Sequence, residues 1–259
     1  MGDFENICKE IKEVKIQGAE NIAKAALIAL SYRQDKEAVK ILISLRPTEP
    51  ALRNTINYAL KEGVKKALDY FKEADKKMIE NGASLIKNKD NVYTHCHSTS
   101  VSKIFQKAKE KKNFVVYNTE TRPLFQGRLT SQDLAKYKIK NIHMVDSAMK
   151  IALKKCNLVL IGADAITKKE VINKVGSELV ADIAEQLKIP LYVCAVSWKF
   201  DKTQTKIEER DAKEVWKDAP EGVRVMNPAF EAIPLEKIKG IVSELGILSP
   251  KDFLKKVRI

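Results

Sequence analysis

The stretch Asn91-Val-Tyr-Thr-His-Cys-His-Ser-Thr-Ser-Val-Ser-Lys-Ile-Phe105 decides the fold. It predicts a short buried strand that ends at Thr94, a turn, and an amphipathic helix that begins near Thr99. The first amide groups of a helix have no partner within it, and the helix dipole favours negative charge there. The turn therefore predicts an anion site, to which Ser98, Thr99 and Ser100 add hydroxyl groups.

The same turn carries the thiol of Cys96. A cysteine near a helix N-terminus tends to have a lowered pKa and to react as the thiolate. On these residues alone, a buried structural cysteine beside an N-cap serine explains the turn equally well.

The composition is that of an ordinary globular chain. Of 259 residues, 44% are hydrophobic and 31% charged, which suits one large domain or two smaller ones. No apolar run approaches the roughly 20 residues that a membrane span needs, and the first residues lack the pattern of a secretory signal. The four cysteines form no Cys-x-x-Cys pair, so we expect reduced thiols and a cytoplasmic protein.

The net charge of +13 indicates an anionic partner. Most lysines stand at helical spacing among glutamates, which is typical of solvated helix faces. Basic residues do not alternate with aromatic ones as they do in single-strand grooves. We therefore expect a small anionic substrate, and neither nucleic acid nor a membrane.

The chain divides near residue 88 into two expected domains. Residues 1–88 predict a helical N-terminal domain with helices at 17–32, 36–45, 50–60 and 64–79, the last capped by Asn81-Gly82. In residues 89–259, strands at 92–93, 114–118, 142–145, 158–161 and 191–196 alternate with helices near 99–105, 131–137, 147–153 and 175–187. This order predicts an α/β fold with a Rossmann-like, doubly wound parallel sheet. The charged segment 199–220 is expected to be a surface excursion.

Polar residues follow the predicted strands. They occupy 94–100, 118–122, 146–147, 162–164 and 197–199. In open parallel sheets, ligands bind beyond the carboxyl ends of the strands. These residues therefore predict one shared site.

Several common site motifs are absent from the sequence. It contains no glycine-rich dinucleotide or phosphate loop, no His-Glu-x-x-His and no Gly-x-Ser-x-Gly. His95 and His97 flank Cys96, but no second pair of ligands is visible, so we expect no metal site.

Cys96 and Asp164 follow different strands, so they could face each other across a substrate. A thiolate and a carboxylic acid can together move a proton between adjacent carbons of a sugar. As the acid, Asp164 would need a raised pKa, which an apolar pocket could provide. A cap after the strand is the alternative role for Asp164.

Several cations could bind a phosphate. Asn173 and Lys174 are expected at a helix start, with Lys174 as the phosphate partner; a solvated lysine is the alternative. Other candidates are Arg46, Arg122, Arg128 and Lys199. Each of these alone could equally be a surface residue or an ion-pair partner.

The segments after the predicted strands form a characteristic series of motifs. They are Thr94-His95-Cys96-His97-Ser98, Thr119-Glu120-Thr121-Arg122-Pro123 with Gln126-Gly127-Arg128, Val145-Asp146-Ser147-Ala148, Gly162-Ala163-Asp164-Ala165-Ile166, Asn173-Lys174-Val175-Gly176, Lys199-Phe200 and Asn227-Pro228-Ala229-Phe230. In this order they resemble archaeal ribose-1,5-bisphosphate isomerase. The wider family contains methylthioribose-1-phosphate isomerase and the regulatory subunits of translation initiation factor 2B.

The resemblance implies conversion of ribose 1,5-bisphosphate to ribulose 1,5-bisphosphate in nucleotide salvage, with no dissociable cofactor, by a homodimer or homohexamer. It implies Cys96 as proton acceptor and Asp164 as proton donor. It also implies substrate-binding residues, which are Gly18, Ala19, Arg46 (in Arg46-Pro47-Thr48), Ser98, Thr99, Ser100, Asn173, Lys174 and Lys199.

One segment differs from the enzymes of that family. They have Arg-Gly-Ala-Gly and a basic residue where this chain has Gln17-Gly18-Ala19-Glu20-Asn21. An arginine fork is lost and an acid gained, which weakens binding of an anion. Two alternatives stay open: a methylthioribose-1-phosphate isomerase, whose substrate has one phosphate, and a non-catalytic subunit that binds translation initiation factor 2. The presence of both Cys96 and Asp164 favours an enzyme.

Overall fold

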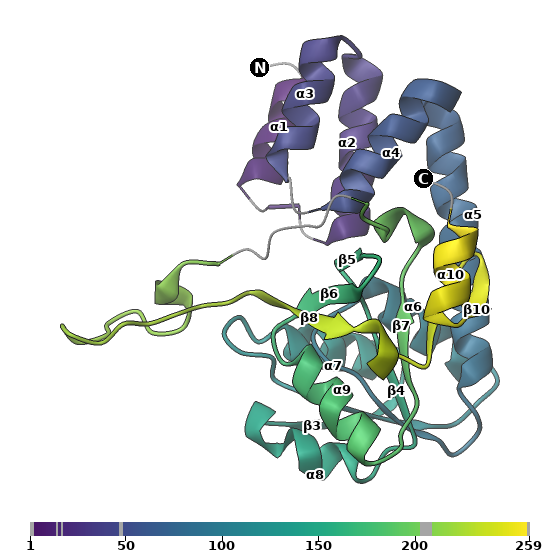
Figure 1. Cartoon of the computed structure of the whole chain (residues 1–259), viewed down its shortest axis with the longest axis vertical. Helices are drawn as coiled ribbons and strands as arrows, with labels where there is room; N and C mark the ends of the chain where they lie inside the picture. The colour runs from purple at the N-terminus through teal and green to yellow at the C-terminus, as the bar shows by residue number, and fades with distance from the viewer. Residues whose placement is uncertain (1–2, 14, 17, 47–48, 203–208, 258–259) are drawn as a thin grey trace.

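The computed structural model describes residues 3–13, 15–16, 18–46, 49–202 and 209–257 of the chain. It is a mixed α/β structure in which a helical N-terminal part stands on a mostly parallel sheet (Figure 1). The predicted fold class is therefore confirmed. The division into two domains at residue 88 stays a prediction.

The N-terminal part consists of helices. They are α1 (Asp3–Lys12), α2 (Ala19–Tyr32), α3 (Lys36–Leu45), α4 (Pro50–Glu62) and α5 (Val64–Leu85). Asp35 caps α3 by accepting hydrogen bonds from the amides of Glu37 and Ala38. Gly63, with φ of +94°, makes the turn from α4 into α5.

The predicted cap at Asn81-Gly82 is wrong, because α5 continues to Leu85. Gly82 instead lets the next helix pack closely. A Cβ atom at this position would lie 2.4 Å from the side chain of Ile104. The glycine therefore serves packing between helices and does not end one.

The main sheet has seven strands in the order β10-β9-β7-β4-β1-β2-β3, and only β10 is antiparallel to its neighbour. The strands are β1 (Asn91–Tyr93), β2 (Val115–Thr119), β3 (Lys140–Met144), β4 (Leu158–Ile161), β7 (Leu191–Cys194), β9 (Gly240–Ser243) and β10 (Gly246–Leu248). The chain winds outward from β1 in one direction to β3 and then crosses to β4 on the other side. The switch point thus lies between β1 and β4, where doubly wound sheets bind ligands.

Helices cover both faces of this sheet. They are α6 (Thr99–Lys109), α7 (Gln126–Lys136), α8 (Met149–Leu153), α9 (Ser177–Gln186) and α10 (Pro250–Lys256). Alternate residues of β4 enter different cores: Leu158 and Leu160 pack with α5, α6 and α7, and Val159 and Ile161 pack with α8, α9 and α10. The helix after β2 begins earlier than predicted, at Gln126.

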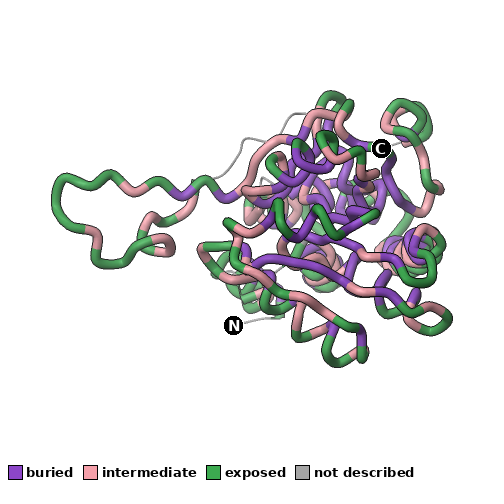
Figure 2. Tube along the Cα trace, turned by 90° about the horizontal axis from the view of Figure 1, so that it is seen from below, coloured by how far each residue is buried: buried purple, intermediate pink, exposed green. Residues whose placement is uncertain are grey.

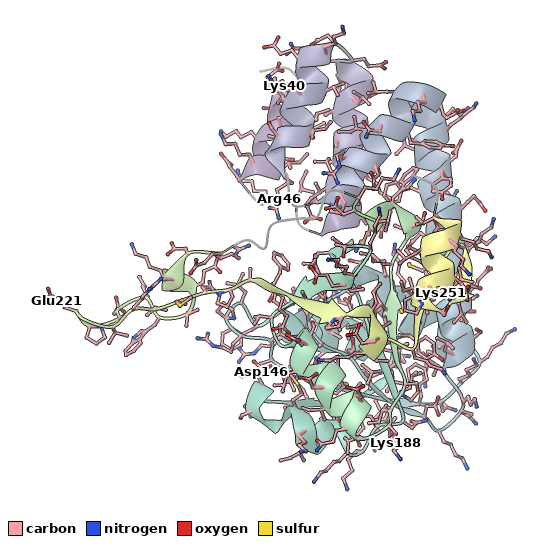
Figure 3. All side chains as sticks on the ribbon, in the orientation of Figure 1. Lys40, Arg46, Asp146, Lys188, Glu221 and Lys251 are labelled. Carbon is pink, nitrogen blue, oxygen red and sulfur yellow. The ribbon has the colours of Figure 1, made fainter. Side chains whose placement is uncertain are left out.

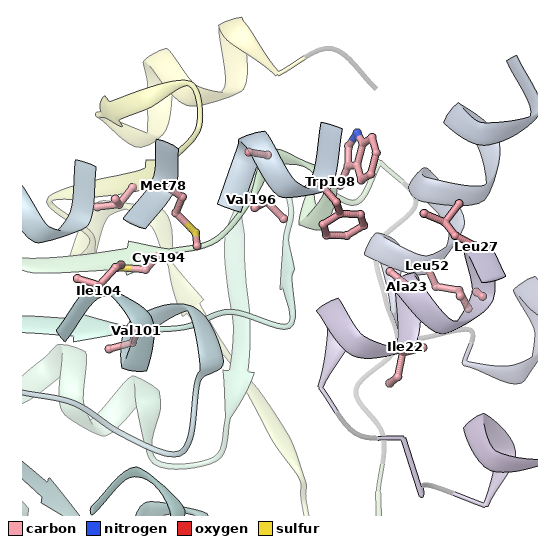
Figure 4. Close-up of a cluster of buried hydrophobic side chains, with 14 of the residues drawn as sticks. Ile22, Ala23, Leu27, Leu52, Met78, Val101, Ile104, Cys194, Val196 and Trp198 are labelled. Carbon is pink, nitrogen blue, oxygen red and sulfur yellow. The ribbon is translucent and has the colours of Figure 1, made fainter. Parts of the chain in front are cut away.

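The first of these cores runs without a break into the N-terminal helices. Figure 4 shows it from Leu27 and Leu52, past Trp198 and Val196, to Ile104 beside the sheet. The N-terminal helices are therefore held firmly above one end of the sheet.

A second, antiparallel sheet has the order β5-β6-β8, made of β5 (Ala165–Ile166), β6 (Glu170–Lys174) and β8 (Phe230–Pro234). Asn173 and Lys174 therefore end a strand, and their predicted place at a helix start is wrong. The residues of β6 pair with β8, some 60 positions further along the chain. Local periodicity does not show such a distant partner.

Beyond the second sheet, an arm of residues 209–229 projects from the body (Figures 1 and 2). It contains the short 3-10 helix η3 (Ala212–Glu214) and a bridge between Glu209 and Pro228. The predicted excursion is confirmed for its described residues from 209 onward. Its start is wrong, because Lys199 ends a buried 3-10 helix, η2 (Ser197–Lys199). Two further 3-10 helices are η1 (Asp146–Ala148) and η4 (Leu235–Lys237).

Candidate active site

A cleft of about 330 Å³ lies at the switch point of the main sheet, below the N-terminal helices. The start of α2, the α3–α4 connection, the turns after β1 and β4, the end of β6, η2 and the base of the arm all contribute to it. Figure 3 shows Arg46 where the helical part meets this region.

The cleft brings together ten of the eleven predicted site residues, which are Gly18, Arg46, Cys96, Ser98, Thr99, Ser100, Asp164, Asn173, Lys174 and Lys199. Ala19, the eleventh, lies between Gly18 and Glu20, which both line the cleft, but its side chain is outside the described part. Pro47, Thr48 and Gln17 also lie outside the described residues.

Cys96 stands in the turn between β1 and α6 with a φ of +64°, in the left-handed region. Its N–H donates to Oγ1 of Thr121 at 3.1 Å, and its carbonyl accepts from Oγ1 of Thr130 at 2.9 Å. Burial raises the pKa of the thiol to about 12, although Lys174 and the His97 amide lower it. The predicted lowering of this pKa is wrong, because loss of solvent outweighs the helix terminus and the nearby cation.

Asp164 follows β4 across the cleft. Burial raises the pKa of its carboxyl group above the usual value, although Lys199, Lys174 and Arg46 all lower it. A carboxyl group with a raised pKa can remain protonated and donate a proton. The environment of Asp164 is thus the one that an acid role requires.

Two buried lysines stand beside this carboxyl group. Lys199 donates from Nζ to the carbonyl oxygen of Ala163 at 2.5 Å. Lys174 lies with Nζ 4.9 Å from the centre of the Phe230 ring. These two contacts are with neutral groups, and both charges also act on Asp164, while that of Lys174 acts on Glu214 as well.

The predicted phosphate cradle forms at the start of α6. Ser98 caps the helix, and its Oγ accepts from the amide of Val101 at 3.4 Å. Gly162 approaches closely here, since a Cβ atom on it would lie 2.6 Å from Oγ of Ser98. Asn173 lines the cleft, and its amide donates to Oγ of Ser177 at the start of α9; its role as a substrate ligand stays a prediction.

Glu20 forms an acidic wall of the cleft. Its carboxylate pairs with Lys24 and with Lys103, 3.2 Å away, and Lys103 also pairs with Asp75 at 2.6 Å. Burial raises the pKa of Glu20, but Lys24 and Lys103 outweigh it, so the pKa lies below its usual value. Glu20 is therefore charged at neutral pH.

Sequence analysis missed two charged lining residues, Glu49 and Arg210. Glu49 forms an ion pair with Arg46, with 3.6 Å between Oε1 and Nη2. Arg210 pairs with Glu214 within the arm, with 2.6 Å between Nη2 and Oε1. Arg46 was itself a candidate, so the acid three positions later in the sequence was the available signal. Arg210 carried none, because only the course of the arm brings it to the cleft.

Other candidates lie outside the cleft. Arg122 donates to the carbonyl of Val215 in the arm, and Arg128 pairs with Glu120. Neither arginine lines the cleft.

The histidines have structural partners. His95 is buried and its Nε2 lies 2.9 Å from the carbonyl of Val175, and His97 bonds Thr130 at 3.2 Å. Among the described residues, no three His, Cys, Asp or Glu side chains gather as metal ligands would. In the same part of the chain, no helix has the length and apolar character needed to cross a membrane.

The fold and cleft define an α/β protein with a helical N-terminal part and a polar cleft, lined by basic and acidic side chains, at the switch point of its sheet. The family model described as "Initiation factor 2 subunit family" matches residues 9–250, and the chain belongs to this family. The resemblance seen in the motifs is thereby confirmed.

Relatives within the family carry two kinds of name. A ribose 1,5-bisphosphate isomerase of Methanocaldococcus jannaschii is 36% identical over 94% of this chain and 90% of its own length. A translation initiation factor eIF-2B subunit 2-like protein of Pyrococcus furiosus is 31% identical over 96% of this chain and 97% of its own. The crystal structure of Pyrococcus horikoshii translation initiation factor eIF-2B superimposes with a TM-score of 0.86 at 28% identity, covering 98% of each chain.

Proposed function

We propose that this protein is an aldose–ketose isomerase that converts ribose 1,5-bisphosphate to ribulose 1,5-bisphosphate in nucleotide salvage. One observation carries the proposal: Cys96 and Asp164, from the ends of β1 and β4, line one cleft together with Lys174 and Lys199. The name of the 36% identical relative supports the same reaction.

The reaction moves one hydrogen from C2 of the sugar to C1, breaks the bond between C1 and the ring oxygen, and leaves a carbonyl group at C2. The proton that the C2 hydroxyl group loses is balanced by the proton that the ring oxygen gains. Cys96, as the thiolate, accepts a proton from the substrate, and Asp164, as the carboxylic acid, donates one. The start of α6 with Ser98, Thr99 and Ser100 binds one phosphate. Lys174, Lys199 and Arg46 attract the anionic substrate to Asp164. No dissociable cofactor takes part.

The direct test is incubation with ribose 1,5-bisphosphate and detection of ribulose 1,5-bisphosphate. We expect turnover by the wild type and a loss of at least about 100-fold in Cys96→Ser and in Asp164→Asn. Cys156→Ser is the matched control, because Cys156 is buried among α8 residues and does not line the cleft. Absence of turnover by the folded wild type, or full activity of Cys96→Ser, would contradict the proposal.

Glu20 favours one second candidate, a methylthioribose-1-phosphate isomerase. Glu20 lines the cleft, and its carboxylate engages Lys24 and Lys103, so these two cations are held by an acid instead of meeting a second phosphate there. A substrate with a single phosphate does not need these cations. Parallel assays with 5-methylthioribose 1-phosphate decide between the two, and Glu20→Gly should raise kcat/KM for the bisphosphate selectively.

A non-catalytic subunit is the alternative from another class, and the eIF-2B-like relative supports it. A pull-down with translation initiation factor 2 tests this alternative. Reactivity of Cys96 at neutral pH does not discriminate, because burial keeps the thiol protonated.

The proposal includes a cytoplasmic homo-oligomer, a dimer or hexamer. The four free cysteines support a reducing compartment. Exposed apolar side chains on the arm, Trp216, Val223 and Met226, support association of copies.

A further inference from the structure

We propose that Thr121 and Thr130 are positioning residues that hold Cys96 in its reactive orientation. The inference rests on the proposed role of Cys96 as proton acceptor. Neither threonine lines the cleft, and each acts through the backbone of Cys96.

The backbone of Cys96 needs such support. A side chain at φ of +64° is disfavoured, and this conformation persists only where the surroundings hold it. Cys96 follows the last residue of β1 by three positions and precedes α6, so neither a strand ladder nor a helix binds its peptide groups. Two side-chain hydroxyl groups bind these peptide groups instead, one at the N–H of Cys96 and one at its carbonyl oxygen.

Thr121 binds the amide side. Its hydroxyl oxygen accepts the Cys96 N–H at 3.1 Å, and the residue is only 1% exposed. Thr121 is itself left-handed, with φ of +57°, and its own N–H donates to Asp146 at 2.8 Å. Burial raises the pKa of Asp146, but the amides of Arg122 and Thr121 outweigh it, so the carboxylate is charged at neutral pH.

Thr130 binds the carbonyl side from the first turns of α7. Its hydroxyl group donates to the Cys96 carbonyl at 2.9 Å. Because the hydroxyl hydrogen is engaged in that bond, the oxygen of Thr130 accepts from Nδ1 of His97 at 3.2 Å. Burial lowers the pKa of His97, so this histidine is neutral at neutral pH. Its one ring proton is on Nδ1, because Nδ1 is the donor to Thr130.

Both threonines come from the β2–α7 segment, which lies beside the β1–α6 turn. The sheet register places the segment beside the turn, because Tyr93 pairs with Tyr117 and the chain then leaves both strands at the same edge of the sheet. The position of the Cys96 thiol thus depends on two side chains that do not line the cleft, although Gln126 and Leu129 of the same segment do. A displacement of about 1 Å can cost about 100-fold in rate.

The test uses Thr121→Val and Thr130→Val, which keep the volume and remove the hydroxyl group. Thr121→Ser and Thr130→Ser are the conservative variants, because they retain the hydroxyl group. Ser102→Ala is the matched control, since it removes a buried hydroxyl on α6 that donates to Asp133 at 2.8 Å and does not contact Cys96.

Two readouts are measured on the full chain. The first is isomerisation of ribose 1,5-bisphosphate, for which the valine variants should lose at least about tenfold in kcat with less than about threefold change in KM. The second is iodoacetamide labelling followed peptide by peptide, in which Cys96 should label at least about threefold faster at neutral pH once it is released. Serine variants and Ser102→Ala should match the wild type in both.

Buried Cys156 and Cys194 report on the alternative that the variants merely loosen the fold. Faster labelling of all three cysteines would overturn the inference, as would valine variants with unchanged kcat and labelling. If the wild type shows no isomerisation but Cys96 labelling alone rises in the valine variants, the proposed function fails and the positioning role stands.

Discussion

At the residue scale, the proposed chemistry depends on the charges around two side chains. The pKa of the Cys96 thiol rises to about 12, and one cation, Lys174, opposes the rise. Around Asp164 three cations oppose it, Lys199, Lys174 and Arg46. Burial raises both pKa values from ordinary values of 3.8 for the carboxyl group and 9.0 for the thiol, so we expect the carboxyl group to remain the more acidic of the two. The form that the proposed mechanism uses, a thiolate facing a carboxylic acid, is then a minor protonation state between the two pKa values.

This order predicts the pH dependence of kcat/KM. The acidic limb reports ionisation of Asp164, because both groups are protonated below it, and the rate stays level until the thiol ionises. Lys199→Met removes a cation that lowers the pKa of Asp164, so the acidic limb should move to higher pH. Rates of isomerisation across the pH range measure the position of this limb. Lys188→Met is the control, because Lys188 is exposed and lies outside the cleft. A limb that stays in place or moves to lower pH would refute the assignment.

The raised pKa of Asp164 also has a cost in stability. The native state binds this proton more tightly than the unfolded chain, where the pKa is about 3.9. Stability is therefore lost as pH rises from that value through the folded pKa. Asp164→Asn cannot ionise, so it should match the wild type near pH 4 and exceed it at pH 7, where about 1 kcal/mol would raise Tm by roughly 2–4 °C.

Thermal unfolding between pH 4 and pH 8 measures this difference. Asp35→Asn serves as a contrast, because hydrogen bonding to Arg33 lowers the pKa of Asp35 and its carboxylate favours the native state above its unfolded pKa. The hypothesis of a desolvated acid would not survive if Asp164→Asn were no more stable than the wild type at pH 7.

At the element scale, helix α4 holds the turn that carries Lys199. Asn54 donates from its amide to the carbonyls of Trp198 and Phe200, both at 2.8 Å, on either side of the lysine. Arg53 pairs with Asp201 at 2.7 Å. The helical part thus fixes one wall of the cleft.

Asn54→Ala leaves two buried carbonyls without these bonds, which costs about 1–3 kcal/mol. Because Lys199 then loses its fixed position, KM for the sugar phosphate should rise about tenfold. Asn81→Ala is the matched control, as its amide donates to Ser243 at 2.9 Å in β9, away from the cleft. Unfolding and steady-state kinetics on both variants test this; equal KM changes in the two would count against the role of α4.

Elements defined by local pattern could be predicted, and those defined by distant pairing could not. The runs at 158–161 and 191–196 gave β4 and β7, since short apolar segments between helices indicate parallel strands. The strand β6 was hidden, because its pairing with β8 depends on residues some 60 positions away. The site followed the same rule: strand ends located Cys96 and Asp164, but the hydroxyl groups that hold Cys96 come from another turn.

At the scale of the whole molecule, the arm of residues 209–229 stands out because little of it packs on the body. It projects from the body and is mostly exposed (Figure 2). Trp216 is 51% and Met226 57% exposed, although both are large and apolar. The arm also borders the site, because Arg210 at its base lines the cleft. Contact of the arm with a second copy would bury these side chains.

This arrangement predicts an assembly that depends on the arm. The wild type should have a mass in solution at least twice the 29.2 kDa of one chain, because burial of apolar surface stabilises association by about 25 cal/mol per Å². Trp216→Ser should shift the equilibrium toward the monomer, and Tyr32→Ser, which removes an equally exposed aromatic residue from α2, should not. Light scattering over a dilution series measures both. Trp216 emission should shift to the red on dilution, since Trp198 stays buried; a wild type that remains a monomer at every concentration would show that the arm has no such role.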